Sequence, residues 1–358
     1  MKRKISVIVA CALAAGSVLA FGSCSDSGKE KLVVYNWGEY IADGSDGSMD
    51  VIAEFEERTG IDVEYVQFES NEEMYTKIKS GSASYDIIIP SDYMISRMIE
   101  EDMLQEINFD NIPNYKYIMD AYKGENVGFD PSGKYSVPYT WGTVGIIYNK
   151  TMVEEPVDSW DILWDETYSG KILMFRNERD AFGLALKKLG YSLNSTSEAE
   201  LREAADLLRE QNSLIDAYVM DEVFGKMESG EDALATYYSG DAVNMMETNP
   251  DLGFAIPKEG TNIFVDAIVI PKNAKNVPAA EKFIDFLCDP EIALENIEYI
   301  CYSSPNSGAY EMLDDEVKNN PVIYPDEEII SNCEAFVHLP PETIQLMSDL
   351  WTEIRAGQ

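Results

Sequence analysis

Aromatic and acidic side chains stand together at two places where predicted strands end. Residues 35–40 read YNWGEY and follow an apolar run at residues 32–34, and residues 91–93 (SDY) follow another at residues 87–89. A tryptophan at a strand end is usually part of the core, but beside a carboxylate it can also bind a cation through its negatively polarised ring face. These residue types therefore offer cation binding by rings and carboxylates.

Two further carboxylates occupy unusual positions. Asp266 interrupts the apolar strand IFVDAIVIP, where an unpaired charge would be costly to bury. Asp180 lies at a predicted helix start, where the helix dipole alone would stabilise it. Trp37, Phe264 and Tyr302, each taken singly, are better explained as ordinary core residues. Asp266 is thus the acidic residue that most clearly requires a positively charged partner or water.

No catalytic motif accompanies these residues. The sequence lacks the patterns GxSxG, HExxH, GxxxxGKS/T and GxGxxG. His338 is the single histidine, and FVHLPPET around it offers no nucleophile, so a structural role is expected. The sequence therefore predicts a binding protein that is not an enzyme and has no cofactor.

A metal site is also not predicted. The acidic loop at residues 43–50 breaks the EF-hand spacing and lacks the closing glutamate. The pair Tyr237-Tyr238 could ligate ferric iron, as adjacent tyrosines do in some α/β binding proteins, but such sites usually add a histidine. Because His338 lies far away in the sequence, iron is kept as a minor alternative. We otherwise expect one tyrosine in the core and the other facing a cleft.

The composition and net charge limit the kinds of molecule that the protein is expected to bind. The chain has 358 residues, 45% of them hydrophobic, and a formal net charge of −38. This length suits one large domain or two of ordinary size. Such a charge repels nucleic acid and anionic membranes, so no nucleic-acid partner is expected. The charge fits solubility alone or a preference for cationic ligands, and by itself does not decide between them.

The N-terminus reads as an export signal. The basic start MKRK precedes the long apolar stretch ISVIVACALAAGSVLAFGS, so residues 1–23 are predicted to be a signal peptide. Cys24 then begins a polar tether at residues 24–30, as in a bacterial lipobox whose cysteine is lipidated, although Phe21 stands where leucine is usual. Lipidation of Cys24 is expected, with simple cleavage as the alternative. The pairing of the other cysteines is left open: Cys288, Cys301 and Cys333.

Strand and helix patterns alternate from residue 31 onward. Strands are predicted at residues 31–35, 61–68 and 85–90, with helices at 49–60, 71–81 and 92–104 between and after them. Gly60 and Gly81 are expected to end the first two helices, and Asn71 to cap the start of the second. This order implies a parallel sheet covered on both faces, with ligands binding beyond the carboxyl ends of its strands. A long strand at residues 137–150 is expected to pass between lobes. A second α/β pattern follows, with strands at residues 171–175 and 232–240 and helices between them. Two further strands are predicted around a Lys-Glu-Gly turn within residues 252–271.

In this order and spacing, the chain resembles the bacterial polyamine-binding proteins of spermidine/putrescine ABC importers. The resemblance covers nearly all of residues 31–356. Its markers are YNWGEY, ESNEEMYTKIKSG, YDIIIPSDYM, SVPYTWGTVGIIYN, SWDILWDETYSGKILM, ALKKLGYSLNST, IPKEGTNIFVDAIVIPKNAKN, YSSPN and YPDEEII.

The resemblance implies an α/β, two-lobed periplasmic-binding-protein fold of type II. Two parallel-rich sheets with helices on both faces would enclose a hinged cleft. Lobe 1 is expected to comprise residues 31–139 and 266–308, and lobe 2 residues 140–265 and 309–358.

The resemblance also implies a ligand site in that cleft, with amines held by carboxylates and methylenes between rings. Asn177 stands where the family has a second carboxylate, and Tyr238 and Phe264 stand where it has tryptophan, so the preferred polyamine stays open. The expected ligand-binding residues are Trp37, Glu39, Tyr40, Ser91, Tyr93, Asn177, Asp180, Tyr238, Phe264, Asp266 and Tyr302.

The implied function is capture of putrescine or spermidine outside the cytoplasm. The protein is expected to be a monomeric lipoprotein, anchored to the outer face of the cell membrane on the periplasmic side. The closed form would dock on the permease subunits of an ABC importer, whose ATPase is a separate chain. The alternatives are another ligand on the same fold (ferric ion, a sugar or an amino acid) or a sensor in place of a transport component.

Overall fold

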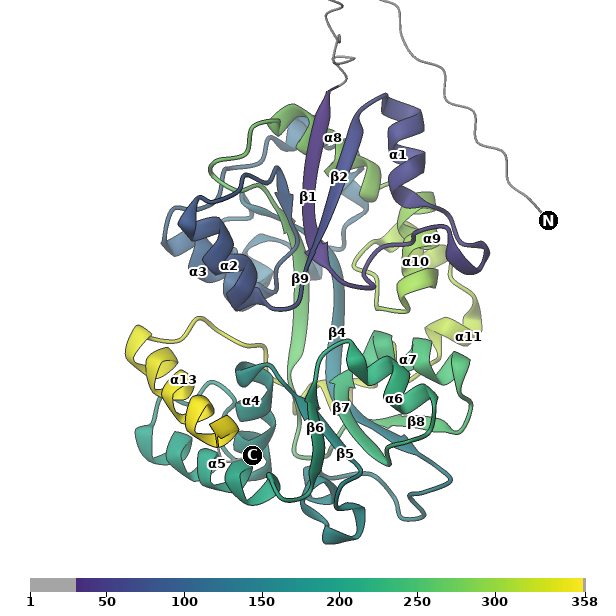
Figure 1. Cartoon of the computed structure of the whole chain (residues 1–358). Coiled ribbons are helices and arrows are strands. Elements are labelled where there is room, and N and C mark those ends of the chain that lie inside the picture. The colour runs from purple at the N-terminus through teal and green to yellow at the C-terminus, as the bar shows by residue number, and fades with distance from the viewer. Residues whose placement is uncertain (1–29, 357–358) are drawn as a thin grey trace, which may run out of the picture.

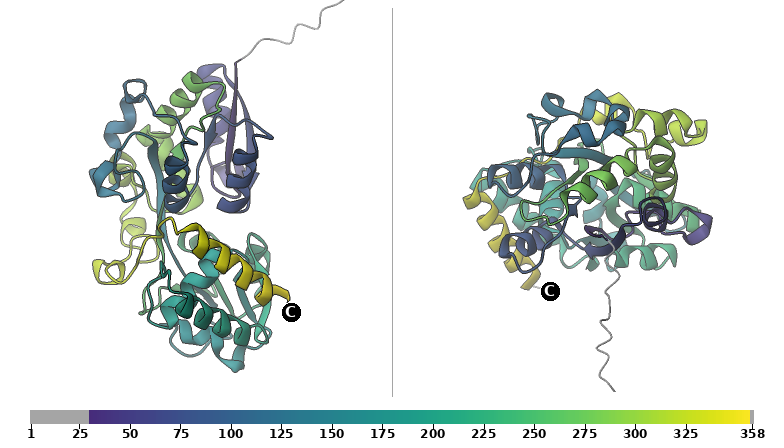
Figure 2. Two further views of the ribbon diagram at one scale, coloured as in Figure 1. Left: turned by 90° about the vertical axis from the view of Figure 1, so that its left-hand side faces the viewer. Right: turned by 90° about the horizontal axis from the view of Figure 1, so that it is seen from above.

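Two long strands, β4 (Ser136–Asn149) and β9 (Ile263–Val269), connect an upper and a lower lobe (Figure 1). The structure is a computed structural model and describes residues 30–356. The predicted signal peptide, Cys24 and the tether up to residue 29 lie outside the described residues. In the side view of Figure 2, the crossings between the lobes lie toward one side of the molecule.

The upper lobe is built on the predicted β-α-β-α-β unit. Strand β1 pairs in parallel with β2 on one side and β3 on the other, because the helices between them return the chain to the same edge. Two longer helices and one short helix from the later part of the chain, after β9, complete this lobe. Its elements are β1 (Lys31–Trp37), α1 (Val51–Thr59), β2 (Asp62–Phe68), α2 (Asn71–Ser80), β3 (Ile87–Ile88), α3 (Asp92–Glu100), α8 (Val277–Leu287), α9 (Pro290–Ile300) and α10 (Ser307–Met312).

The lower lobe repeats the α/β arrangement. Strand β5 pairs in parallel with β6 and β7, and the C-terminal helix α13 packs beside α4 and α5 (Figure 1). Its elements are β5 (Ile172–Phe175), α4 (Glu178–Lys188), α5 (Glu198–Gln211), β6 (Ile215–Val219), α6 (Glu222–Glu228), β7 (Leu234–Tyr238), α7 (Ser239–Thr248), β8 (Leu252–Ala255) and α13 (Pro341–Ala356).

Short helices occupy the connections. Two are single α-helical turns near the C-terminus, and the others are 3₁₀ turns. They are α11 (Asp315–Lys318), α12 (Glu327–Ile330), η1 (Ser45–Gly47), η2 (Phe109–Asn111), η3 (Pro113–Tyr117), η4 (Asp120–Tyr122), η5 (Gly124–Asn126), η6 (Trp160–Trp164) and η7 (Glu166–Tyr168).

The two predicted sheets are joined edge to edge. The strand order is β2-β1-β3-β9-β4-β7-β5-β6, with β8 also on β4. The first half of β4 pairs with β9, and its second half pairs with β7 and β8. Gly145 allows β8 to pack this closely on β4, because a Cβ at residue 145 would lie 2.3 Å from the Phe254 ring. One curled sheet therefore runs through both lobes of the predicted α/β fold.

Each lobe has its own hydrophobic core. In β1, Leu32 and Val34 pack on one face of the upper sheet, and Tyr35 packs on the other, as strand alternation requires. The lower core includes Trp160 and Phe182. Separate cores leave the space between the lobes free for a ligand. The residue boundaries predicted for the lobes stay a prediction.

Helix caps fix the strand-end loops near that space. Gly60 and Gly81 end α1 and α2 in the left-handed conformation, with φ of 72° and 65°, as predicted. The expected N-cap of α2 at Asn71 is wrong, because the Ser70 side chain accepts from the Glu73 N–H at 3.2 Å. Asn71 is instead free to bond elsewhere. Among residues 30–356, no helix has the length and apolar character needed to cross a membrane.

Candidate functional site

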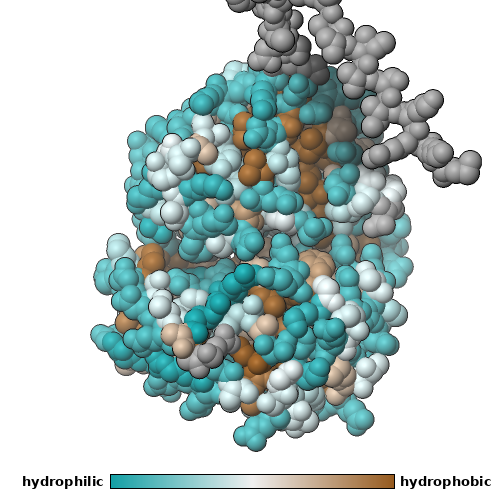
Figure 3. Space-filling model, in the orientation of Figure 1, coloured by the Kyte–Doolittle hydropathy of each residue, from teal (hydrophilic) through white to brown (hydrophobic). Residues whose placement is uncertain are grey.

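A cleft between the lobes collects the strand ends and helix starts of both. It encloses about 680 Å³, part of which is open to solvent. The surface in Figure 3 is largely hydrophilic and is hollowed between the lobes. All the residues predicted to bind ligand, except Glu39, line this cleft. The structure therefore brings ten of the eleven predicted residues together around one cleft, and their role in binding stays a prediction.

The upper-lobe wall combines rings with Asp266. Trp37, at the end of β1, packs on Phe68 with ring centroids 4.6 Å apart. Tyr40 packs edge-on against Tyr302 at 5.1 Å, and its hydroxyl donates to Asp266 Oδ2 at 2.8 Å. Asp266 is 4% exposed, and its other oxygen, Oδ1, has no hydrogen-bond partner among the described residues. One buried carboxylate oxygen in the cleft is thus left for a ligand.

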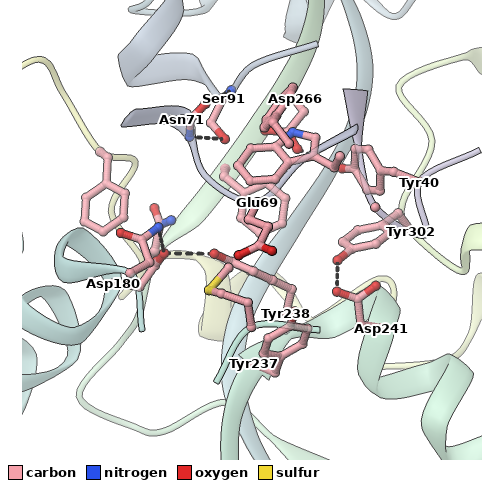
Figure 4. A pocket seen from close by; sticks show the side chains of 18 of the residues that line it. Tyr40, Glu69, Asn71, Ser91, Asp180, Tyr237, Tyr238, Asp241, Asp266 and Tyr302 are labelled. Carbon is pink, nitrogen blue, oxygen red and sulfur yellow. Dashed lines mark hydrogen bonds between the residues drawn. The ribbon is translucent and has the colours of Figure 1, made fainter. Parts of the chain in front are cut away.

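The lower-lobe wall centres on Asp180. Its Oδ2 accepts hydrogen bonds from the Tyr238 hydroxyl and from Asn177 Nδ2, both at 2.9 Å (Figure 4). Asn177 also caps α4 through the Arg179 N–H. Tyr238 meets Phe264 edge-on with centroids 5.6 Å apart. Asn177 therefore orients the carboxylate of Asp180 and adds no charge of its own.

Ser91 and Tyr93 lie at the start of α3. Ser91 is the N-cap residue but makes no side-chain cap bond. Its Oγ accepts from Asn71 Nδ2 at 3.1 Å, and its N–H donates to Asn71 Oδ1 at 3.2 Å. The Tyr93 hydroxyl donates to Glu72 at 2.9 Å. This pair of hydrogen bonds between Asn71 of α2 and Ser91 at the start of α3 fixes the upper rim of the cleft.

Glu39 lies apart from the other predicted residues. It borders an adjoining hollow with Asp43, Asp50 and Glu56. Its backbone has φ of 48°, a left-handed conformation that is uncommon outside glycine. Burial, with Asp221 and Asp43 nearby, raises the pKa of Glu39. The structure therefore does not bring Glu39 into the cleft wall.

Several acidic residues of the cleft were missed by sequence reasoning. Asp241, in the first turn of α7, accepts from the Tyr302 hydroxyl at 2.9 Å, and Asp221 accepts from the Tyr237 hydroxyl at 3.1 Å. Glu69 also lines the cleft, as does Asp92, which the sequence placed at a strand end but which was not among the expected ligand-binding residues. Their position in the sequence could have identified them, because each of these acidic residues follows the carboxyl end of a strand or a helix start. Asp241 in YYSGD at residues 237–241 is an example.

Burial dominates the electrostatics of the cleft. It raises the pKa of Asp266 to about 6, of Asp180 to about 7, and of Asp92 and Asp241 to about 8. Hydrogen bonds from tyrosine hydroxyls limit the rise at Asp180 and Asp241, and the side chains of Ser91 and Tyr40 limit it at Asp266. Among the described residues, none that lines the cleft is lysine, arginine or histidine. A cation entering the cleft would compensate carboxylates that now lack a positive partner.

The remaining chemical candidates lie elsewhere. His338 is 3.9 Å from Glu100. In the described part of the chain, no cluster of three or more His, Cys, Asp or Glu side chains is placed to hold a metal ion. Cys288, Cys301 and Cys333 are free thiols. Tyr237 belongs to the lower core, but it lines the cleft together with Tyr238, so the expected division between the two tyrosines is only partial.

Comparison with known proteins agrees with the fold and the cleft. The model of the family described as bacterial extracellular solute-binding protein matches residues 50–324. The spermidine/putrescine-binding periplasmic protein of Escherichia coli (strain K12) is 35% identical over 325 residues, covering 90% of this chain and 91% of that protein. The putrescine-binding periplasmic protein SpuD of Pseudomonas aeruginosa (strain UCBPP-PA14) is 30% identical over the full length of both chains.

Solved structures give the same result. One from Listeria monocytogenes, described as a spermidine/putrescine ABC transporter, superposes with a TM-score of 0.87 at 40% identity, over 92% of this chain and 100% of that chain. The substrate-binding protein PotD of Streptococcus pneumoniae, solved with calcium and HEPES, superposes with a TM-score of 0.77 at 41% identity. The match covers 92% of this chain and 99% of that chain.

Two α/β lobes around a ligand-sized cleft define the class of periplasmic binding proteins. The chain belongs to the bacterial extracellular solute-binding proteins and, within them, to the family of spermidine/putrescine-binding proteins of ABC importers. Its homologues are polyamine-binding periplasmic components of these importers.

Proposed function

We propose that this protein binds a polyamine in the cleft and delivers it to an ABC importer. The observation that carries the proposal is Asp266, a buried carboxylate with an unpartnered oxygen, in a cleft that holds further carboxylates and aromatic rings. A polyamine has positive ends and an apolar spacer, and it matches both kinds of group. A sugar would leave the carboxylates uncompensated. An amino acid would add a carboxylate to a cleft without basic lining residues.

The aromatic rings and the carboxylates contribute to binding in different ways. Burying about seven methylenes of spermidine contributes roughly 5–6 kcal/mol, at about 0.8 kcal/mol each, and each cation–π contact adds about 0.5–2 kcal/mol. A micromolar complex needs about 8 kcal/mol, and ordering of a flexible ligand opposes these terms. The rings therefore supply much of the affinity, and Asp180, Asp241 and Asp266 select the spacing of the amines.

Isothermal titration calorimetry tests the proposal directly. Putrescine, spermidine and spermine are titrated into the protein without its signal segment, with glucose, glutamate and ferric citrate as controls. Saturable binding is expected for at least one polyamine and for none of the controls. Binding of a control without any polyamine overturns the proposal. Mass spectrometry of the recovered ligand should show it unchanged, because a chemically altered ligand would indicate an enzyme.

Transport is the proposed use of that binding. Closure of the lobes brings Trp37 and Asp266 from one lobe against Asp180 and Tyr238 from the other, and the closed monomer docks on the permease subunits. Uptake of labelled spermidine by cells that express the importer tests this step. Uptake should require the protein. Normal uptake in a strain lacking it would instead favour a sensor.

We further propose that the mature protein is an extracytoplasmic lipoprotein attached through Cys24. Its small-residue context and the polar stretch after it support attachment, as does a solved lipoprotein of Treponema pallidum, TpPotD, with 26% identity and a TM-score of 0.79. Labelling with a palmitate analogue should modify the wild type, and Cys24→Ser should abolish the label. Persistent label in that variant would exclude Cys24.

A further inference from the structure

Asp92 is a buried carboxylate that forms no ion pair with any of the described residues. Its side chain is 3% exposed and lines the cleft. Oδ1 accepts from the Tyr93 N–H at 2.6 Å, and Oδ2 accepts from the Val265 N–H at 3.3 Å. No lysine, arginine or histidine of the described residues lies within ion-pair distance of it. Two backbone hydrogen bonds orient this carboxylate without neutralising its charge, and Arg179 acts on it only from beyond ion-pair distance.

Asp92 and Asp266 are neighbours on the upper lobe. Ser91 pairs with Asp266 in an antiparallel bridge, and the Ala267 N–H donates to the Pro90 carbonyl at 3.2 Å. Because the backbones are tied at these positions, the start of α3 lies directly beside β9. Two buried carboxylates, each presented by a fixed backbone, thus share one part of the cleft.

This carboxylate pair lies between the two ends of the cleft. Asp266 is close enough to raise the pKa of Asp180 and also that of Asp241. In Figure 4, Asp180 and Asp241 stand on opposite sides of the cleft, and Asp266 projects from above between them. Asp180 and Asp241 therefore mark the two ends of the row of acidic groups, and Asp266 marks its middle. That arrangement matches three amines in a row.

We infer that Asp92 and Asp266 together hold the central secondary ammonium of a triamine, which makes Asp92 a specificity-determining residue. This inference rests on the proposed polyamine function. A secondary ammonium has two N–H donors, one for each carboxylate. Asp180 and Asp241 then receive the terminal ammonium groups. Spermidine is the probe of this class, and an unbranched eight-carbon diamine has the same length without the central amine.

The protonation of the empty site agrees with this role. Burial, together with the neighbouring Asp266, raises the pKa of Asp92 to about 8, although the two backbone hydrogen bonds and Arg179 on α4 limit the rise. Near neutral pH, Asp92 in the empty cleft therefore carries a proton. A bound ammonium would displace that proton, because it stabilises the ionised form.

The test is a cycle of two proteins and two ligands. Calorimetry measures the affinities of wild type and Asp92→Asn for spermidine and for the eight-carbon diamine. The variant should lose roughly 30-fold or more in spermidine affinity, the lower end of the cost of breaking a desolvated charge pair. Its diamine affinity should change less than about threefold. Asp251→Asn, an exposed residue outside the cleft, is the charge-matched control and should change neither.

Each other outcome has a definite meaning. Equal losses for both ligands, or no loss for either, overturn the role of Asp92 at the central amine. If wild type binds neither ligand, the proposed function itself fails. Thermal unfolding shows whether Asp92→Asn remains folded. Should it unfold, Asp92→Ser keeps a hydroxyl acceptor for the Tyr93 N–H, and the same ligand comparison decides.

Discussion

Arg176 and Glu69 face each other across the mouth of the cleft, with 4.0 Å between Arg176 Nη1 and Glu69 Oε2. Arg176 follows β5 in the lower lobe, and Glu69 follows β2 in the upper lobe. On its own lobe Arg176 is held by Glu222, whose two carboxylate oxygens accept from Nη2 at 2.7 and 2.6 Å. A positioned guanidinium of one lobe thus meets an acidic group of the other.

This ion pair should contribute little to closure. The side chains of Arg176 and Glu69 are 35% and 67% exposed, so their coupling is expected to be below about 1 kcal/mol. A double-mutant cycle of Arg176→Gln and Glu69→Gln on spermidine affinity measures it. The coupling should disappear in about 1 M salt, where the screening length is about 3 Å. A larger coupling that resists salt would show that the pair is shielded from solvent in the bound form.

Gly38 should be required for full closure. A Cβ on Gly38 would lie 2.7 Å from Asp221 Oδ2, and Asp221 is itself held by the Tyr237 hydroxyl. Gly38→Ala is expected to cost about 1–3 kcal/mol of ligand affinity through overpacking, as measured by calorimetry.

Two variants control for this interpretation. Gly225→Ala adds a methyl group where nothing lies within 4 Å, and it should leave affinity unchanged. Combining Gly38→Ala with Asp221→Ala should recover part of the loss by removing the contact. Unaltered affinity in Gly38→Ala alone would show that Asp221 moves aside freely.

Loss of Asp266 should weaken polyamine binding more than loss of any exposed acid. Asp266→Ala leaves an ammonium desolvated and unpaired, at an expected cost of about 2–5 kcal/mol. Calorimetry with spermidine measures the loss, and Asp251→Asn serves again as control. If the affinity of Asp266→Ala equals that of wild type, the ligand does not bind at this residue.

The stability of the unliganded protein should fall as pH rises. Burial raises the pKa of Asp180 to about 7 and of Asp241 to about 8, above the value of about 3.9 for an unfolded aspartate. The folded protein therefore retains protons that the unfolded chain has lost. Its melting temperature should drop from about pH 4 to about pH 8, and the variant Asp180→Asn/Asp241→Asn should drop less. An equal drop would assign the effect to other groups.

Ligand affinity should have the opposite pH dependence. Polyamines bind the ionised carboxylates, so affinity should rise between about pH 6 and pH 8 and binding should release protons. Calorimetry at one pH in two buffers of different ionisation enthalpy measures the proton release. Binding without proton release near neutral pH would mean that the cleft carboxylates are already ionised.

Local patterns in the sequence determined the elements and their order. Alternating apolar residues and glycine caps predicted β1, β2, α1 and α2, because strand faces and helix ends depend on neighbouring residues. The same patterns placed Trp37 and Ser91 at one sheet edge, since parallel strands end on the same side. Asp266 was recognisable because a charge within an apolar strand is costly wherever that strand is buried.

Only the tertiary structure decided which distant residues meet. Asp241 bonds Tyr302, which lies 61 positions away, and Asp92 meets Asp266 because α3 packs on β9. Glu39 leaves the cleft wall although its neighbours line it. The raised pKa values also depend on desolvation by both lobes. The sequence by itself indicated the class of site and named ten of the residues that line the cleft. The crossing of β4 and β9 decided its geometry, because that crossing brings separate lobes together around one cleft.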